Sequence, residues 1–385
     1  MSVAITACRK PYKPEVVAEP NSYLVVEGLI NSGADSTIIK LNRTVRLSGT
    51  STVNPEKGAA VSVESELNES IQLIEKPNGV YVYPGLNLST SHQYRLKIRT
   101  AGGREYASDF EPVMVAPLID SLSYKVESNG VSINANTHDP ENNTRYYRWE
   151  YDETWVYTST FQSKYKSNGD TVLSRDLIND EIYTCWRSAY SSTIVLGSSA
   201  KLSRDVISDA PVTFLSRHSE KIRHKYSALI RQYPLTKGAY EFWVNLKKNT
   251  EQLGGIFDVQ PSQINGNIHS VIDANEPVIG YVSISNYSSK RIFVDQRKLP
   301  TWLDYIDDGC KVEDFTYLYR NPITGEVENQ VDEYINFRRA TREIYIPLEG
   351  ITDIVTHLIL GYHAALPECV DCTLHGTNKQ PSFWQ

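Results

Sequence analysis

The feature that most constrains the fold is a series of short segments, between residues 21 and 115, in which apolar and polar residues alternate. Residues 36–47 form the clearest of these segments, because Ile39, Leu41 and Val45 all fall on one parity. Side chains of a strand point alternately to its two faces, so this pattern predicts strands with one buried face. Turn formers at Pro77-Asn78-Gly79 and Ala101-Gly102-Gly103 separate such segments as hairpin turns do. The pattern predicts an N-terminal β-sandwich over residues 21–115.

Residues 116–385 are predicted to form a second, larger β-rich domain. Segments 121–126, 130–135 and 145–157 are expected to be its opening strands. Residues from about 162 to 208 are polar, and we expect an insertion with short strands there, because structureless loops of that length are uncommon. An α-helix is predicted over residues 236–253, where Thr236 is a suitable N-cap residue. The residues that share its apolar face are Ala239, Phe242, Trp243 and Leu246.

The expected fold class is therefore mainly β. It consists of two Ig/fibronectin-like β-sandwich domains, the second enlarged by the insertion and by one α-helix.

The first eight residues end in Ile5-Thr6-Ala7-Cys8, which has the composition of a bacterial lipobox. Small side chains before the cysteine suit signal peptidase II, and the cysteine then carries the acyl chains. We predict that residues 1–8 are the remnant of a lipoprotein signal and that Cys8 is the lipidation site. The alternative is a frayed N-terminus with a chance cysteine. Residues 9–20 contain three prolines and are predicted to be an extended tether.

The charge of the chain excludes one class of partner. Lys plus Arg number 39 and Asp plus Glu number 46, which gives a net charge of -7. Nucleic-acid-binding proteins carry clustered basic charge, so no nucleic-acid partner is expected. No run approaches the roughly 20 apolar residues of a membrane-spanning helix. The predicted tie to a membrane is therefore the lipid.

Four further cysteines are disulfide candidates in an exported chain: Cys185, Cys310, Cys369 and Cys372. In the preferred arrangement Cys369 pairs with Cys372 in a small ring and Cys185 pairs with Cys310. In the other, Cys369 and Cys372 each pair with one distant cysteine. A zinc site at Cys369, Cys372 and His375, with His363 upstream, is a weaker alternative, because such sites favour reducing compartments.

The sequence contains no recognisable catalytic motif. It lacks a Gly-x-Ser-x-Gly elbow, a His-Glu-x-x-His helix and a phosphate-binding Gly-Lys-Ser/Thr loop. No catalytic residue, metal or cofactor is therefore predicted. The densest acidic group is Asp304, Asp307 and Asp308, which a solvated loop explains better than a catalytic pair does. The polar loop 138–143 is interpreted as a turn, because it lacks the spaced oxygen ligands of a calcium loop.

Aromatic residues concentrate in two of the expected strand segments of the second domain. Strands naturally bury such residues, and a position in the core is the favoured interpretation. The alternative is a ligand-binding surface that stacks on a sugar or a peptide. The candidates for that surface are Tyr146, Trp149, Tyr151, Trp155 and Trp186.

Several short motifs, in a fixed order along the chain, resemble those of one family. After the lipobox they are Tyr23-Leu24-Val25-Val26-Glu27-Gly28, Ile119-Asp120-Ser121, Cys185-Trp186, Ala239-Tyr240-Glu241-Phe242-Trp243, Gly255-Ile256-Phe257-Asp258-Val259-Gln260-Pro261, Gly266-Asn267-Ile268, Gly280-Tyr281, Glu368-Cys369-Val370-Asp371-Cys372-Thr373 and Pro381-Ser382-Phe383-Trp384. In this order they resemble domain-of-unknown-function family 4249, lipoproteins of the Bacteroidetes.

The resemblance implies an accessory of a TonB-dependent outer-membrane receptor and brings no catalytic residues with it. We therefore expect a lipid-anchored, cell-surface protein of the outer membrane that docks on such a β-barrel receptor and assists nutrient capture or uptake without catalysis. An independent adhesin or envelope assembly factor is the alternative. A surface hydrolase is a weaker one.

Overall fold

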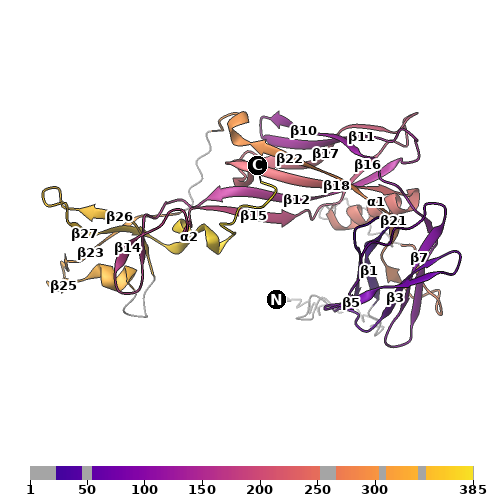
Figure 1. Ribbon diagram of the computed structural model, residues 1–385, viewed down its shortest axis with the longest axis horizontal. Helices are drawn as coiled ribbons and strands as arrows, with labels where there is room; N and C mark the ends of the chain where they lie inside the picture. Colours follow the sequence, from indigo (N-terminus) through magenta and orange to yellow (C-terminus); the bar gives the residue numbers. More distant parts are fainter. Residues whose placement is uncertain (1–22, 46–53, 252–265, 303–308, 337–343, 385) are drawn as a thin grey trace, which may run out of the picture. The chain divides into compact units, whose positions relative to one another are not determined.

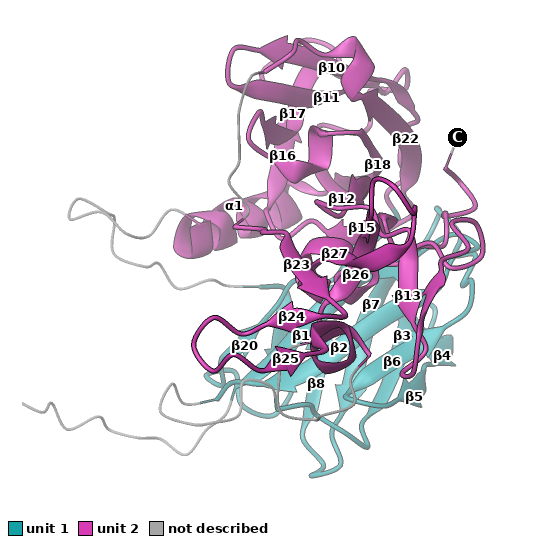
Figure 2. Cartoon of the chain, turned by 90° about the vertical axis from the view of Figure 1, so that its left-hand side faces the viewer, with its two compact units in different colours: residues 1–113, 261–284 teal, residues 114–260, 285–385 magenta. Residues whose placement is uncertain are grey.

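The computed structural model describes residues 23–45, 54–251, 266–302, 309–336 and 344–384. The chain divides into two compact units (Figure 2). Unit 1 comprises residues 1–113 and 261–284, and unit 2 comprises residues 114–260 and 285–385. The sequence-based boundary assigned residues 261–284 to the second domain, whereas their strands pair with strands of the N-terminal segment. Cys8 and the predicted tether over residues 9–20 lie outside the described residues.

Unit 1 is a β-sandwich of two sheets (Figure 1). One sheet has the order β20-β1-β2-β6-β5, with β21 also paired to β1, and the other has the order β19-β8-β7-β3-β4, with β9 paired to β7. Alternate residues such as Ile39, Leu41 and Leu96 are fully buried in its core, as the period of two predicts. The strands are β1 Leu24–Asn31, β2 Thr37–Arg43, β3 Ala60–Ser65, β4 Ser70–Gln72, β5 Ile74–Lys76, β6 Val80–Tyr83, β7 Gln93–Arg99, β8 Glu105–Ser108, β9 Glu111–Pro112, β19 Ile268–Ser270, β20 Val278–Ile279 and β21 Ser283–Ser285.

Residues 266–284, in which the chain returns to unit 1, are called the returning segment. Their backbone packs directly against neighbouring backbone, and two glycines make this possible. A Cβ on Gly266 would lie 1.6 Å from the carbonyl oxygen of Gly280, and a Cβ on Gly280 would lie 2.2 Å from that of Val26. Gly280 also has a φ of +145°, which side chains rarely tolerate. The buried Asn267 amide then donates to the Val282 carbonyl oxygen at 3.0 Å and accepts from the Val282 N–H at 2.9 Å. These contacts give a structural reason for two of the motifs noted in the sequence.

Unit 2 is built on a second sandwich, whose sheets have the orders β10-β11-β17 and β15-β12-β18-β22, with β16 paired to β12. Figure 1 shows β10 and β11 above β12 and β18. Its core includes Ile133 and Leu215 from the first sheet and Tyr226 and Ile230 from the second. The strands are β10 Ile119–Glu127, β11 Gly130–His138, β12 Tyr146–Thr158, β15 Thr184–Tyr190, β16 Val195–Ser198, β17 Val206–Ser216, β18 Lys225–Leu235 and β22 Ser288–Asp295, with short 3-10 helices η1 Glu220–Ile222 and η2 Gln296–Lys298.

The predicted helix is present as α1 Lys237–Glu251. The Oγ1 atom of Thr236 accepts a hydrogen bond from the Ala239 N–H at 3.3 Å, as an N-cap residue does. Ala239 and Phe242 are buried. The guanidinium carbon of Arg148 lies over the ring of Trp243, 4.1 Å from the ring centroid. The expected mainly β fold with one substantial helix is confirmed in the described residues. None of their helices is long and apolar enough to cross a membrane.

A small lobe completes unit 2, with its own core of aromatic and aliphatic residues. Phe315, Val331 and Tyr362 are buried there, and burial raises the pKa of the Tyr362 hydroxyl. The lobe contains the sheet β23-β27-β26 and two hairpins. Its elements are β13 Tyr165–Ser167, β14 Val172–Ser174, β23 Glu313–Thr316, β24 Tyr319–Arg320, β25 Val327–Glu328, η3 Val331–Ile335, β26 Ile346–Thr352, β27 Ile359–Ala365, α2 Pro367–Val370 and η4 Cys372–Leu374.

Two disulfides join the base of the small lobe to its surroundings. Cys310 pairs with Cys369, and Cys185 of β15 pairs with Cys372, each with Cα atoms 5.7 Å apart. The preferred arrangement, a Cys369–Cys372 ring with a Cys185–Cys310 bond, is therefore wrong, and the alternative, in which Cys369 and Cys372 each pair with one distant cysteine, is confirmed. After α2, the Cys372 N–H donates to the carbonyl oxygen of Ile182, just before β15, at 2.8 Å, and the Thr377 N–H donates to that of Trp186 in β15 at 3.0 Å. This register places Cys372 beside Cys185 and leaves Cys369 in the cluster that contains Cys310.

Candidate functional site

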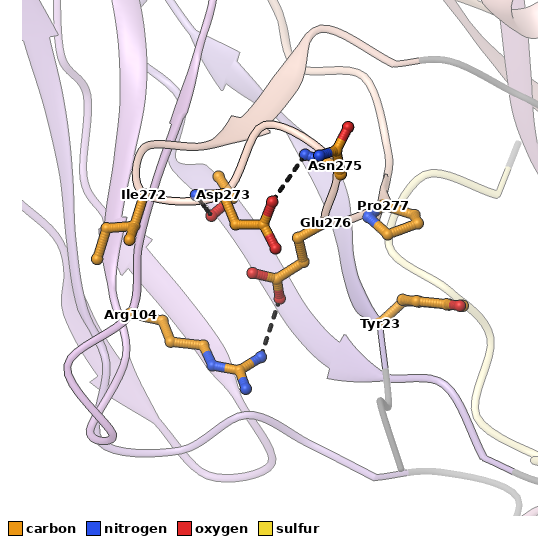
Figure 3. A pocket seen from close by; sticks show the side chains of 8 residues that line it. Tyr23, Arg104, Ile272, Asp273, Asn275, Glu276 and Pro277 are labelled. Atoms are coloured by element: carbon orange, nitrogen blue, oxygen red, sulfur yellow. Dashed lines mark hydrogen bonds and ion pairs between the residues drawn. The ribbon is translucent and has the colours of Figure 1, made fainter. Parts of the chain in front are cut away.

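A polar cavity of about 490 Å³ opens in unit 1, around the turn between β19 and β20. Figure 3 shows the Glu276 carboxylate directed at the guanidinium of Arg104, and the Asp273 carboxylate facing the N–H of Asn275. The lining residues are Tyr23, Arg104, Ser270, Ile272, Asp273, Asn275, Glu276 and Pro277.

The carboxylates of this cavity are already bound to groups of the protein itself. Glu276 accepts from the hydroxyl of the fully buried Tyr106 at 2.6 Å and from Arg104 at 3.0 Å. Hydrogen bonding to Tyr106 and the charge of Glu276 raise the pKa of Arg104. Arg43 lies 3.5 Å from the same hydroxyl and pairs with Glu56 at 2.6 Å. The chain of polar contacts fastens the returning segment to β8 and β2, which is a structural role.

A group of exposed aliphatic side chains lies at one end of the small lobe of unit 2. Ile354 and Val355, in the turn between β26 and β27, are 91% and 85% exposed. The Tyr317 N–H donates to the Leu360 carbonyl oxygen at 2.9 Å, which brings the end of β23 beside the start of β27. We call this group the apolar tip, and its members are Leu318, Ile354, Val355, Leu358, Ile359 and Leu360.

Three consecutive residues of the apolar tip, Leu358 to Leu360, are all exposed. Successive side chains of a strand point to opposite faces, so neither face of the sheet is covered at this end. Burial on β27 begins at Gly361 and Tyr362, where the core of the small lobe starts. The apolar tip is therefore a convex projection beyond that core.

The turn that carries the apolar tip is held in one conformation by Asp353. Its carboxylate accepts from the Val355 N–H at 3.0 Å and from the Thr356 N–H at 2.7 Å. These hydrogen bonds, chiefly those from Thr356, lower the pKa of the Asp353 carboxyl. His357 has a φ of 57°, which reverses the chain, and the Asp353 N–H then donates to the Leu358 carbonyl oxygen at 2.9 Å. The exposed side chains are thus presented on an ordered turn.

Comparison with known families assigns the chain. The family model described as Domain of unknown function (DUF4249) matches residues 9–291, which is more than half of the chain. The chain belongs to the DUF4249 family. The match covers the described part of unit 1 and much of the sandwich of unit 2, and the apolar tip lies beyond it.

Comparisons of the DUF4249 chain with curated proteins and with solved structures carry less weight than the family match. No curated protein matches it. Among solved structures it is similar to one described as the Yersinia pseudotuberculosis adhesin InvE, at 12% identity and a TM-score of 0.15. That alignment covers 56% of this chain and 55% of that chain, so it spans about half the length of the adhesin.

The aromatic candidates of this DUF4249 member do not form one surface. Trp149, Tyr151 and Trp155 are buried in the core of unit 2, and the Trp149 Nε1–H donates to the Gln232 side-chain oxygen at 3.0 Å. Tyr146 is partly buried against Tyr240 of α1, at 4.8 Å between ring centroids. Trp186 is partly buried near Trp384, at 6.4 Å. Three of the five candidates therefore lie in the core, whereas Tyr146 and Trp186 are only partly buried.

The metal alternatives find no support in the described parts of the chain. Cys369 and Cys372 are in disulfides, and no group of three or more His, Cys, Asp or Glu side chains there is suited to hold a metal ion. In the loop 138–143, the Asp139 carboxylate accepts from the N–H groups of Glu141, Asn143 and Thr144. These donors stabilise a turn, as the sequence indicated. Asp304, Asp307 and Asp308 lie outside the described residues.

Sequence reasoning missed the apolar tip. The run Leu358-Ile359-Leu360 has the composition of a strand that is buried on both faces, so this composition gives no sign that these residues are exposed. One signal in the sequence could have indicated the exposed turn. In Asp353-Ile354-Val355-Thr356, Asp favours a turn, and the two aliphatic residues that follow it would then lie in that turn.

Proposed function

We propose that this DUF4249 protein is a non-catalytic accessory of a TonB-dependent outer-membrane receptor. It is anchored by lipid at Cys8, binds the receptor by protein–protein contact and assists nutrient capture or uptake. The observation that carries the proposal is the apolar tip, since exposed apolar groups that project from an ordered scaffold are typical of binding surfaces.

Two further observations support it. The two disulfides agree with an exported protein, because such bonds persist in oxidising compartments. They also lie at the base of the small lobe, where Cys369 and Cys310 belong to one cluster, so they restrain the element that displays the tip.

The test is a mild-detergent pull-down of the full-length, lipidated protein from its native outer membrane, followed by mass spectrometry. A β-barrel receptor recovered in stoichiometric amount is the expected result. Recovery of the lipoprotein alone, under conditions that preserve other receptor complexes, would overturn the proposal.

A further inference from the structure

The apolar tip has a charge environment that distinguishes between possible partners. From Ile346 to Ala365 the chain contains no Lys or Arg, while it contains Asp353 and Glu349, which pairs with Lys164. In the other segment of the tip, one basic residue, Arg320, lies two residues after Leu318. Hairpins and helices that bind anionic lipid surfaces carry basic residues beside their apolar groups. The cores of protein–protein interfaces are instead apolar and depleted in charge. The composition therefore favours a protein partner over a lipid surface.

The order of the turn also bears on how the apolar tip binds. Asp353 fixes the turn by accepting hydrogen bonds from Val355 and Thr356 before any partner is present. A preorganised element loses less conformational freedom on binding than a flexible one. Because the apolar tip is convex, the surface that it fits is concave.

From these observations we propose that the apolar tip inserts, as a preformed turn, into an apolar groove on the receptor protein. Ile354 and Val355 are the residues that enter the groove most deeply. This inference rests on the proposed function and adds the surface, the residues and the chemistry of the partner.

Ile354→Ser/Val355→Ser is the variant that tests the inference. Both side chains are almost fully exposed, so the variant is expected to fold and to keep the wild-type melting temperature. The matched control is Ile178→Ser. Ile178 is 86% exposed in unit 2, and it also lies in a turn in which an aspartate, Asp176, accepts its N–H at 2.9 Å.

The full-length, lipidated wild type, the double variant and the control are each purified from native outer membranes. We expect receptor recovery to fall by roughly tenfold or more in the double variant, as when central interface residues are truncated, and to be unchanged in the control. A photo-crosslinking residue at position 355 is expected to form an adduct with the receptor, and one at position 178 is not.

The outcomes separate the two proposals. If the wild type recovers no receptor, the proposed function falls and the inference falls with it. If the wild type and the double variant recover equal amounts, the function stands and the inference alone is overturned. An adduct at position 355 between two copies of this chain would assign the tip to self-association. Tip-dependent flotation of the Cys8→Ser chain with phosphatidylethanolamine/phosphatidylglycerol vesicles would assign it to lipid. Either result would overturn the inference.

Discussion

The β1–β2 hairpin of unit 1 and the β26–β27 hairpin of unit 2 are both antiparallel and rich in aliphatic residues, yet they differ in burial. In β2, Ile39 and Leu41 are fully buried, while Ile38, on the opposite face of the strand, is 46% exposed. At the start of β27, Ile359 and Leu360 are both exposed. A second sheet covers the inner face of β2, whereas β27 begins beyond the core of its lobe. The same residue types thus form a core or an exposed surface according to whether a facing layer exists.

The largest effect is expected for a substitution in the buried β1–β2 hairpin. Leu41→Ala removes a fully buried side chain and should lower the free energy of unfolding by about 2–5 kcal/mol, through lost burial and a residual cavity. Ile354→Ala in the apolar tip should change it by less than about 0.5 kcal/mol. Chemical denaturation of both variants measures the difference. Equal destabilisation would show that the tip is buried in solution.

The second prediction concerns the bond that ties the small lobe at its base. Cys310→Ser/Cys369→Ser removes one disulfide without leaving a free thiol, and should cost about 2–4 kcal/mol, because the unfolded chain regains freedom. Denaturation with and without a reducing agent measures it: the wild type should become less stable on reduction, and by more than the variant. A variant as stable as the oxidised wild type would contradict the assigned pairing.

A smaller effect is expected where unit 1 fastens its returning segment. Glu276→Gln keeps an acceptor for Tyr106 but removes the charge that this buried hydroxyl and Arg104 share, which should cost about 1–2 kcal/mol. Arg104→Gln should cost less than about 1 kcal/mol, since its side chain is 54% exposed and water screens the ion pair. Thermal unfolding of both variants measures the two losses of stability. A larger loss in Arg104→Gln than in Glu276→Gln would show that the exposed ion pair contributes more than the hydrogen bond from Tyr106.

The smallest effect is expected for the hydrogen bonds that Asp353 accepts in the exposed turn between β26 and β27. Hydrogen bonds from Thr356 and Val355 keep the pKa of Asp353 below its usual value, so the turn gains stability above the unfolded pKa of about 3.8 and loses it as the pH falls through the folded value. Amide exchange of Val355 and Thr356 should therefore be protected near neutral pH in the wild type and less protected in Asp353→Asn. Equal protection in the two proteins would mean that Asp353 does not fix the turn.

Local patterns predicted much of the fold. The alternation around Ile39 and Leu41 predicted a buried strand face, and the spacing of Ala239 and Phe242 predicted a helix, because both signals depend only on neighbours in the chain. The mainly β fold class and the family resemblance are confirmed by the structure and by the family match. Lipidation, the receptor partner and the surface location stay predictions.

Properties that depend on distant segments were not predicted. The pairing of Cys185 with Cys372 follows from the course of the C-terminal segment along β15, which no local pattern encodes. The return of β20 to β1 is likewise a long-range contact. Leu358 to Leu360 are exposed because no other layer of the described residues covers them. Aliphatic residues are buried in most strands, so composition alone would have predicted burial here.

The return of residues 261–284 to unit 1 also orders events during synthesis. The chain leaves this sandwich at residue 113, and β19 and β20 are made only after residues 114–260. Until then β8 and β1 have open edges, and open edges pair with other chains. A chain synthesised from its N-terminus therefore completes its first domain only after residues 114–260 of the second have been made. Strict domain-by-domain folding in the order of synthesis, which is the general tendency of multidomain chains, therefore does not complete unit 1 of this protein.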